Sequence, residues 1–256
     1  MRRLLASLLL CATPSWAEQP VLRFAIAESW SMPLIRIKHG QPVEGILYDL
    51  MQSAASEAGV RPEYHVLARL RMQQAMEDSD IDVRCHLATN WLIERPGEYI
   101  WSVPLMVQRD LLVSRAGLLD PVDASRLPAQ AIGTVLGYSY PTLQPLFSRG
   151  QLHREDSRSQ QLALQKLQAG RYQYAVSNEL SLQWFNRQLP AEAQLQSRAL
   201  LDEQNLGCVV RSDPSRPPQA LLRTLVRIKQ SGEMERIVQH YAAPTSPAPM
   251  VSGSHQ

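Results

Sequence analysis

The chain has 256 residues, of which 45% are hydrophobic, and it carries 26 basic and 24 acidic side chains. This apolar content is enough to build a core, and the length fits one large domain or two smaller ones. The formal net charge of +2 gives no electrostatic footprint for nucleic acid and no attraction to an anionic membrane surface.

The N-terminus has the layout of a secretory signal peptide. Two arginines precede a short apolar run over residues 4–12, and small residues stand before a predicted cut after Ala17. The run is too short to span a bilayer, which takes about 20 residues; a buried N-terminal helix is the alternative. Cys11 follows a leucine, where a lipoprotein signal has a small residue, so it belongs to the discarded segment. Without residues 1–17 the chain is formally neutral, and we predict a periplasmic protein.

Two cysteines remain after this cleavage, Cys85 and Cys208. An even number of cysteines in an oxidising compartment favours a disulfide. Two separate buried thiols, each acting as a small hydrophobic residue, are the alternative. Neither the cysteines nor the scattered histidines have the spacing of a metal site, and no cofactor is predicted.

The first half of the chain alternates strands and helices. Short apolar runs predict strands, and apolar residues at helical spacing predict helices. This order is typical of a parallel α/β layer. The predicted elements are a strand over 22–27, a helix over 46–58, a strand over 64–67, a helix over 70–76 and a strand over 81–87.

A second α/β unit follows a loop with two prolines at 117–128. The tail after residue 243 is rich in proline and serine and is predicted to be disordered. The predicted elements are strands over 111–114, 131–135, 172–176 and 206–210, and helices over 142–147, 159–168, 179–189, 218–228 and 233–241.

Several segments, in order, resemble the amino-acid-type (family 3) extracellular solute-binding proteins of ABC transporters. They are Glu44-Gly45-Ile46-Leu47-Tyr48-Asp49-Leu50, Asp80-Ile81-Asp82-Val83, Glu94-Arg95 with Tyr99-Ile100-Trp101-Ser102-Val103-Pro104-Leu105, Ile132-Gly133-Thr134-Val135-Leu136-Gly137-Tyr138-Ser139, and Gly232-Glu233-Met234-Glu235-Arg236-Ile237. Each segment is weak evidence alone, but their order and spacing extend the resemblance over nearly the whole mature chain.

The resemblance implies an α/β, two-lobed periplasmic-binding-protein fold (type II), in which each lobe is a mainly parallel sheet flanked by helices. Two crossover strands, near 111–114 and 200–206, would join the lobes. Lobe 1 would comprise residues 18–112 and 205–243, lobe 2 residues 113–204, and residues 244–256 the disordered tail. The predicted strands that carry Cys85 and Cys208 would share the sheet of lobe 1, which favours the bridge.

The resemblance also nominates binding residues in lobe 1. Trp30 stands where the family places an aromatic ring that stacks on the ligand; a core tryptophan is the alternative. Arg95 stands where the family's carboxylate-binding arginine would be, although the segment before it has an extra residue; a surface arginine is the alternative. Thr89, Asn90 and Trp91 replace the family's serine-rich stretch and are further candidate contacts.

In lobe 2 the candidates are Tyr138, Ser139 and Asn178. The turn Gly137-Tyr138-Ser139 precedes a predicted helix, so its amides and the serine hydroxyl are candidates to hold an anionic group; an ordinary strand-to-helix turn is the alternative. Asn178 occupies the position of the family's aspartate for the α-ammonium group. Because asparagine carries no formal charge, this departure puts an ordinary α-amino acid ligand in doubt.

The sequence thus favours a monomeric binding protein that closes on an amino acid or a related carboxylate and delivers it to an ABC-type permease. A second hypothesis is a sensing subunit for a membrane signalling partner. A third is a dehydratase on prephenate-like acids, for which Glu28 and Glu179 are the candidate acids.

Overall fold

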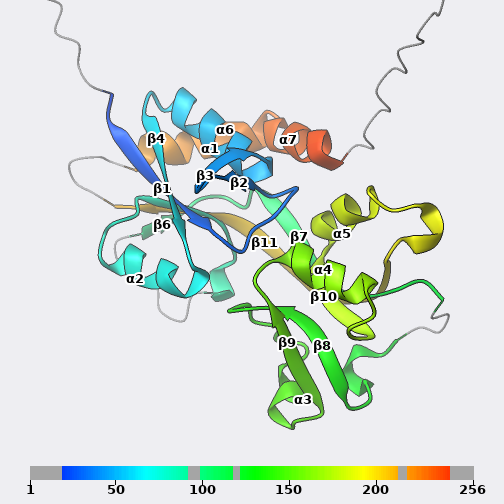
Figure 1. The fold of residues 1–256 in the computed structure, drawn as a ribbon. Coiled ribbons are helices and arrows are strands. Elements are labelled where there is room, and N and C mark those ends of the chain that lie inside the picture. The colour runs from blue at the N-terminus through cyan, green and yellow to red at the C-terminus, as the bar shows by residue number, and fades with distance from the viewer. Residues whose placement is uncertain (1–18, 92–98, 118–121, 213–217, 243–256) are drawn as a thin grey trace, which may run out of the picture.

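The computed structural model describes residues 19–91, 99–117, 122–212 and 218–242. Within these residues one nine-stranded sheet runs in the order β4-β1-β5-β11-β7-β10-β8-β9, with β6 paired to β11. Helices pack around its two ends and form two lobes (Figure 1). Among the described residues no helix is long and apolar enough to cross a membrane.

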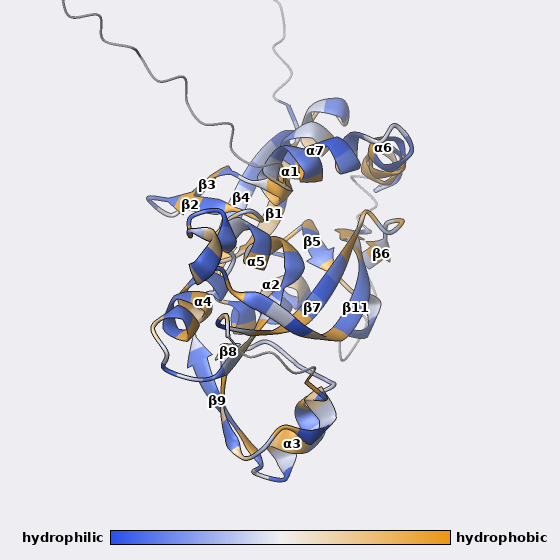
Figure 2. Cartoon of the chain, turned by 90° about the vertical axis from the view of Figure 1, so that its right-hand side faces the viewer, coloured by the Kyte–Doolittle hydropathy of each residue, from blue (hydrophilic) through white to orange (hydrophobic). Residues whose placement is uncertain are grey.

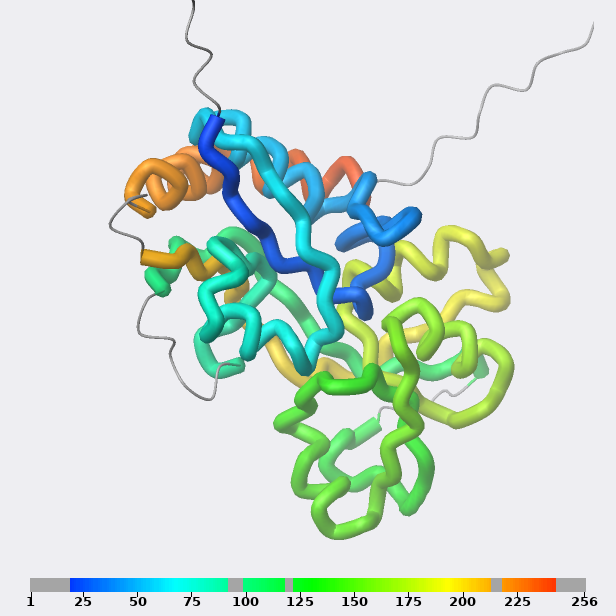
Figure 3. Tube along the Cα trace, turned by 60° about the vertical axis from the view of Figure 1, so that its left-hand side comes forward, coloured from blue at the N-terminus to red at the C-terminus, as the bar shows by residue number. Residues whose placement is uncertain are grey.

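Lobe 1 surrounds the first part of the sheet, where β4, β1 and β5 are parallel and β11 and β6 are antiparallel to their neighbours. Helix α1 packs against α6 and α7, although it lies far from them in the sequence (Figure 3). Its elements are β1 (Val21–Ala27), α1 (Ile46–Glu57), β4 (Arg61–Leu67), α2 (Met72–Glu77), β5 (Val83–Leu87), β6 (Tyr99–Trp101), α6 (Gln219–Gln230) and α7 (Glu233–Ala242).

Lobe 2 surrounds the second part of the sheet, where β9, β8 and β10 are parallel. Successive strand residues face opposite sides, so Leu112 joins one apolar cluster and Val113 the other. The sheet therefore has a core on each face. The elements of this lobe are β8 (Gln130–Val135), α3 (Gln144–Ser148), β9 (Leu152–Ser157), α4 (Gln160–Gln168), β10 (Tyr174–Asn178) and α5 (Glu179–Asn186).

Two long antiparallel strands cross between the lobes, β7 (Met106–Ser114) and β11 (Gln196–Arg211). Residues 196–206 of β11 pair with β7, and residues 207–211 pair with β5 or β6 in lobe 1. Figure 2 shows the two strands side by side, with hydrophilic stretches on both. The predicted strand over 206–210 is only the end of β11, because the polar residues before it gave no strand pattern.

Other elements differ from the sequence prediction. The hairpin of β2 (Arg36–Lys38) and β3 (Gln41–Glu44), the short β6 and the strand β9 were not predicted. β9 has the sequence LHREDS and is defined by its pairing with β8, not by an apolar pattern. Strand β10 begins at Tyr174 and helix α3 at Gln144, each two residues later than predicted.

A disulfide joins Cys85 of β5 to Cys208 of β11, which lie opposite each other on antiparallel strands. The predicted bridge is confirmed. It ties the crossover strand β11 to the strand of lobe 1 that carries Arg84 and His86 on either side of Cys85.

Helix α1 begins directly after Gly45, whose backbone no other residue adopts easily, with φ 126° and ψ 166°. A Cβ atom there would lie 2.6 Å from the Cα atom of Ile35. We expect Gly45→Ala to lower the free energy of unfolding by about 1–3 kcal/mol through backbone strain alone, and by more because of this clash. Urea unfolding measures it. Gly40→Ala is the control, because Gly40 also has positive φ, 76°, but nothing lies within 4 Å of its added Cβ. Equal losses in both variants would contradict the role of the clash.

Candidate functional site

A cavity of about 510 Å³ lies between the lobes, beside the crossover strand β7. Lobe 1 supplies side chains from η1 (Arg69–Arg71), α2, β5 and η2 (Thr89–Trp91), and lobe 2 supplies the turn after β8 and the end of β10. A second cavity, of about 410 Å³, lies against α7 and is lined by apolar residues such as Leu105 and Met234 and by polar ones such as Lys229. The interlobe cavity is the candidate site because polar and aromatic groups from both lobes converge there.

Most of the binding residues nominated from the sequence line this interlobe cavity. Thr89 is exposed on η2 and is not among the lining residues. Arg95 lies outside the described residues. The lining residues that the sequence nominated are Trp30, Asn90, Trp91, Tyr138, Ser139 and Asn178.

Aromatic rings form one wall of the cavity. The ring of Trp30, which is only 7% exposed and also packs into the core of lobe 1, meets the His86 ring edge-on at 5.6 Å. The His86 ring in turn lies 6.4 Å from that of Trp91. Trp30 is therefore both a core residue and a lining residue, and the wall suits the apolar part of a small solute.

Arg69 connects the two lobes across the cavity. Its guanidinium lies over the Tyr138 ring at 4.5 Å and the Trp91 ring at 5.7 Å, and Nε donates a hydrogen bond to the Gly137 carbonyl at 3.0 Å. The hydroxyls of Ser29 and Tyr138 are 3.3 Å apart, a second contact between the lobes. The lobes thus touch at both the ring and the hydroxyl of Tyr138. Sequence reasoning missed Arg69.

A buried arginine, Arg84 of β5, also lines the cavity and is 7% exposed. Its guanidinium donates to Sδ of Met76 at 3.6 Å. Burial, and then the nearby charge of Arg69, lowers the pKa of Arg84 to about 10, so it stays charged at neutral pH. The sequence signal was an arginine between the apolar residues Val83 and Cys85 of a predicted strand.

His86 follows two residues later and has an unusual backbone, with φ 59°. Burial, and then the charge of Arg69, lowers its pKa to about 3. The ring is therefore neutral at neutral pH and acts as an aromatic surface. Among the described residues no group of His, Cys, Asp and Glu side chains is arranged to hold a metal ion.

Two carboxylates lie opposite each other on the crossover strands: Asp110 of β7 and Asp202 of β11. Burial, and then the charge of Asp202, raises the pKa of Asp110 to about 6, although a hydrogen bond from Gln108 at 2.9 Å opposes the shift. Asp110 lines the cavity. The sequence analysis did not nominate it, because nothing in the sequence shows that 110 and 202 are neighbours.

The two lobe 2 sites differ in detail from the prediction. Asn178 Oδ1 accepts a hydrogen bond from the Ser181 amide at 2.8 Å, so it caps helix α5. The turn at Tyr138 and Ser139 is separated from α3, because that helix begins at Gln144 and has only five residues. The structure therefore has no helix start directly beside Ser139, where one was predicted to hold an anionic group.

The two acids considered for a dehydratase do not line the interlobe cavity. Glu28 is exposed after β1. Glu179 forms an ion pair with Arg109 at 3.2 Å and lines the second cavity. The hypothesis thus loses both candidate acids.

The fold is that of the two-lobed periplasmic binding proteins, with a sheet flanked by helices in both lobes and two crossover strands between them. An ancestral arginine-binding protein bound to arginine is similar, with a TM-score of 0.71, 19% identity and coverage of 89% of this chain and 100% of that chain. A histidine kinase sensor domain has a TM-score of 0.69, 19% identity and coverage of 90% and 99%.

An ancestral amino-acid-binding protein, AncCDT-1, described as a precursor of cyclohexadienyl dehydratase, has a TM-score of 0.68, 16% identity and coverage of 87% and 95%. At these identities the similarity establishes the fold. No family model matches the sequence, and no curated protein matches it.

Proposed function

We propose that this chain is an exported solute-binding protein that captures an amino acid or a related carboxylate between its lobes and does no chemistry on it. The observation that carries the proposal is the interlobe cavity, where aromatic and charged side chains from both lobes converge. The similar ancestral protein binds arginine in the same fold. Closure would proceed by bending of the two crossover strands.

We further propose the boundaries and the compartment expected from the sequence. Lobe 1 is assigned to residues 18–112 and 205–243 and lobe 2 to residues 113–204, after removal of the signal peptide in the periplasm. Expression with the leader in a Gram-negative host, followed by N-terminal sequencing of the periplasmic protein, tests this. Glu18 as the first residue would support it, and an uncleaved chain would contradict it.

A thermal-shift screen of the periplasmic protein tests solute binding. A ligand that binds only the folded state raises the melting temperature as its concentration rises. The panel holds amino acids, di- and tricarboxylates, polyamines and prephenate. A saturable rise with one chemical class supports the proposal, and no rise with any compound contradicts it. Product release from prephenate would favour the dehydratase alternative instead.

We expect Trp30→Ala to weaken the binding of any ligand found in the screen by roughly 10–100-fold, because about 1.5–3 kcal/mol of apolar contact is lost. Isothermal titration calorimetry measures the change. Trp184→Ala is the matched control: this tryptophan stacks on Arg187 and does not line the cavity. Equal affinities for the Trp30 variant and the parent protein would remove Trp30 from the site.

The partner is an ABC-type permease in this proposal, and the similarity to a kinase sensor domain keeps a signalling partner as the second candidate. Photo-crosslinking in the native periplasm distinguishes them when it is repeated with and without the ligand. Ligand-dependent recovery of a permease subunit supports transport, and recovery of a membrane kinase supports sensing.

A further inference from the structure

We propose that Arg84 and Asp110 are the two charged receptors of the interlobe cavity: Arg84 binds a carboxylate of the ligand, and Asp110 binds its ammonium group. The inference rests on the proposed solute-binding function and narrows it to zwitterionic ligands. Neither residue was nominated from the sequence, which pointed to Arg95 and Asn178.

Within the part of the chain that the structure describes, Arg84 is a cation without an acidic partner. It is 7% exposed, and among the described residues no carboxylate lies within ion-pair distance of it. Elsewhere in lobe 1 the chain pairs its partly buried arginines: Arg23 and Arg211 both bind Asp82, at 2.8 Å each. A buried charge is costly unless it is paired. A ligand carboxylate would supply the pair for Arg84, and a guanidinium binds it through two parallel hydrogen bonds.

Asp110 is an acid in the complementary situation. It lies opposite Asp202, so two negative charges adjoin, and its hydrogen bond comes from the neutral amide of Gln108. The positive charge of Arg69 acts on Asp110, but the Arg69 guanidinium contacts the Gly137 carbonyl and two aromatic rings. Asp110 also pairs in register with Asn178. The negative charge missing at Asn178 is thus present one strand away.

The charges of the lining favour a zwitterion over a simple anion. Arg69 and Arg84 are balanced by Glu77 and Asp110, and His86 is neutral. A dicarboxylate would set a negative group near Asp110. A ligand with one carboxylate and one ammonium group gives both Arg84 and Asp110 a partner.

The test is calorimetry with L-glutamine, L-leucine and L-phenylalanine, each beside its deaminated acid and its decarboxylated amine. We expect an amino acid to bind the parent protein at least ~10-fold more tightly than either analogue, since each lacks one charged hydrogen-bonded pair. In Asp110→Asn the amino acid should bind no better than the deaminated acid. In Arg84→Met it should bind no better than the amine. Arg149→Met and Asp123→Asn, outside the cavity, should leave affinity unchanged.

Circular dichroism and the melting temperature show whether each variant is folded. If Arg84→Met or Asp110→Asn fails to fold, Arg84→Lys and Asp110→Glu, which keep the charges, take their place. Deaminated acids that bind the parent protein as tightly as amino acids would overturn the inference while leaving solute binding in place. Binding by no member of any solute class would overturn the proposed function, and the inference with it.

The pH dependence of ligand affinity adds a readout that a merely structural role of Asp110 would not change. The groups that face Asp110 are Asp202, Gln108, Asn178, Arg69, Tyr138 and Tyr140. Because the pKa of Asp110 is raised to about 6 without ligand, and the ammonium group binds the ionised form, affinity for the amino acid should fall as the pH falls through 6. Asp110→Asn should lose this dependence. If the affinity of Asp110→Asn depended on pH as that of the parent protein does, the role of Asp110 would be overturned.

Discussion

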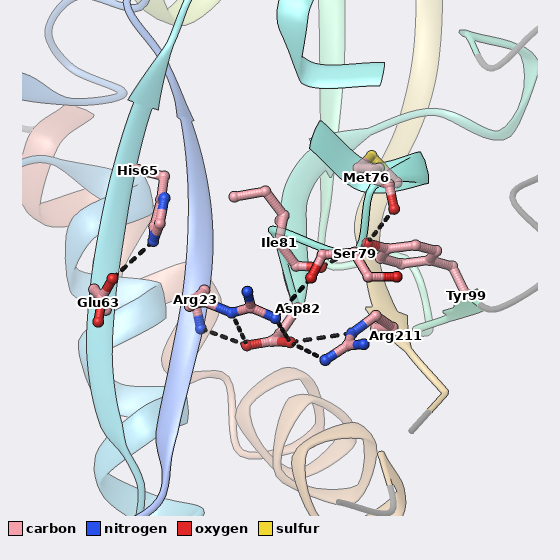
Figure 4. A network of polar contacts seen from close by, with 9 residues as sticks. All are labelled: Arg23, Glu63, His65, Met76, Ser79, Ile81, Asp82, Tyr99 and Arg211. Atoms are coloured by element: carbon pink, nitrogen blue, oxygen red, sulfur yellow. Dashed lines mark hydrogen bonds and ion pairs between the residues drawn. The ribbon is translucent and has the colours of Figure 1, made fainter. Parts of the chain in front are cut away.

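Replacing Asp82 by alanine is expected to lower the free energy of unfolding by about 3 kcal/mol or more, because two arginines lose their shared carboxylate. Asp82 is 5% exposed, and Arg23 and Arg211 approach it from opposite sides (Figure 4). Arg23 donates from its backbone amide as well as from its guanidinium. The three residues join β1, the residue directly before β5 and the end of β11, so the loss affects the sheet of lobe 1.

The same group gives an acid-dependent contribution to stability. Burial opposes ionisation of Asp82, but hydrogen bonds from Arg23 and Arg211 outweigh it and lower its pKa. The stabilisation is therefore present above the unfolded value of about 3.9 and is lost as the pH falls through the lower folded value. Asp82→Asn should remove this dependence in urea unfolding between pH 5 and 2.

Asp80→Ala is the matched control for Asp82. Asp80 is exposed two residues earlier, and its removal should change the unfolding free energy by no more than about 0.5 kcal/mol. If Asp82→Ala were as stable as Asp80→Ala, the ion pairs would not stabilise the sheet.

Removing the disulfide by replacing Cys85 and Cys208 with alanine should lower the free energy of unfolding by about 2–5 kcal/mol, because the bridge closes a long loop in the unfolded chain. The two cysteines are separated by 123 positions. For a chain of this length the melting temperature should fall by roughly 4–20 °C. Differential scanning calorimetry measures both quantities.

A reductant separates the effect of the bond from that of the side chains. Both cysteines are buried, so reduction has to be carried out on the unfolded protein before refolding. The reduced parent should then melt like the double variant, while the double variant should not respond to the reductant. A parent that melts at the same temperature oxidised and reduced would show that the bridge does not stabilise the fold.

The sequence by itself determined the order of most helices and strands, and with it the α/β class. Helix α1 is an example: Ile46, Leu47, Leu50 and Met51 recur on one helical face, and all are buried. Such patterns can be read from the sequence because the side of a helix or strand that is buried on folding is apolar. The even number of exported cysteines likewise predicted the Cys85–Cys208 bridge.

Only the tertiary structure decided which polar residues share the cavity. Strand β9 and the first part of β11 are polar, and their pairing partners define them, not their own composition. Arg84 and Asp110 are 26 positions apart in the sequence and lie on β5 and β7, the strands on either side of β11, yet both line one cavity. The pattern of a strand shows which of its residues are buried. The charges that a buried residue faces, however, depend on the strands and lobes that β7 and β11 bring together.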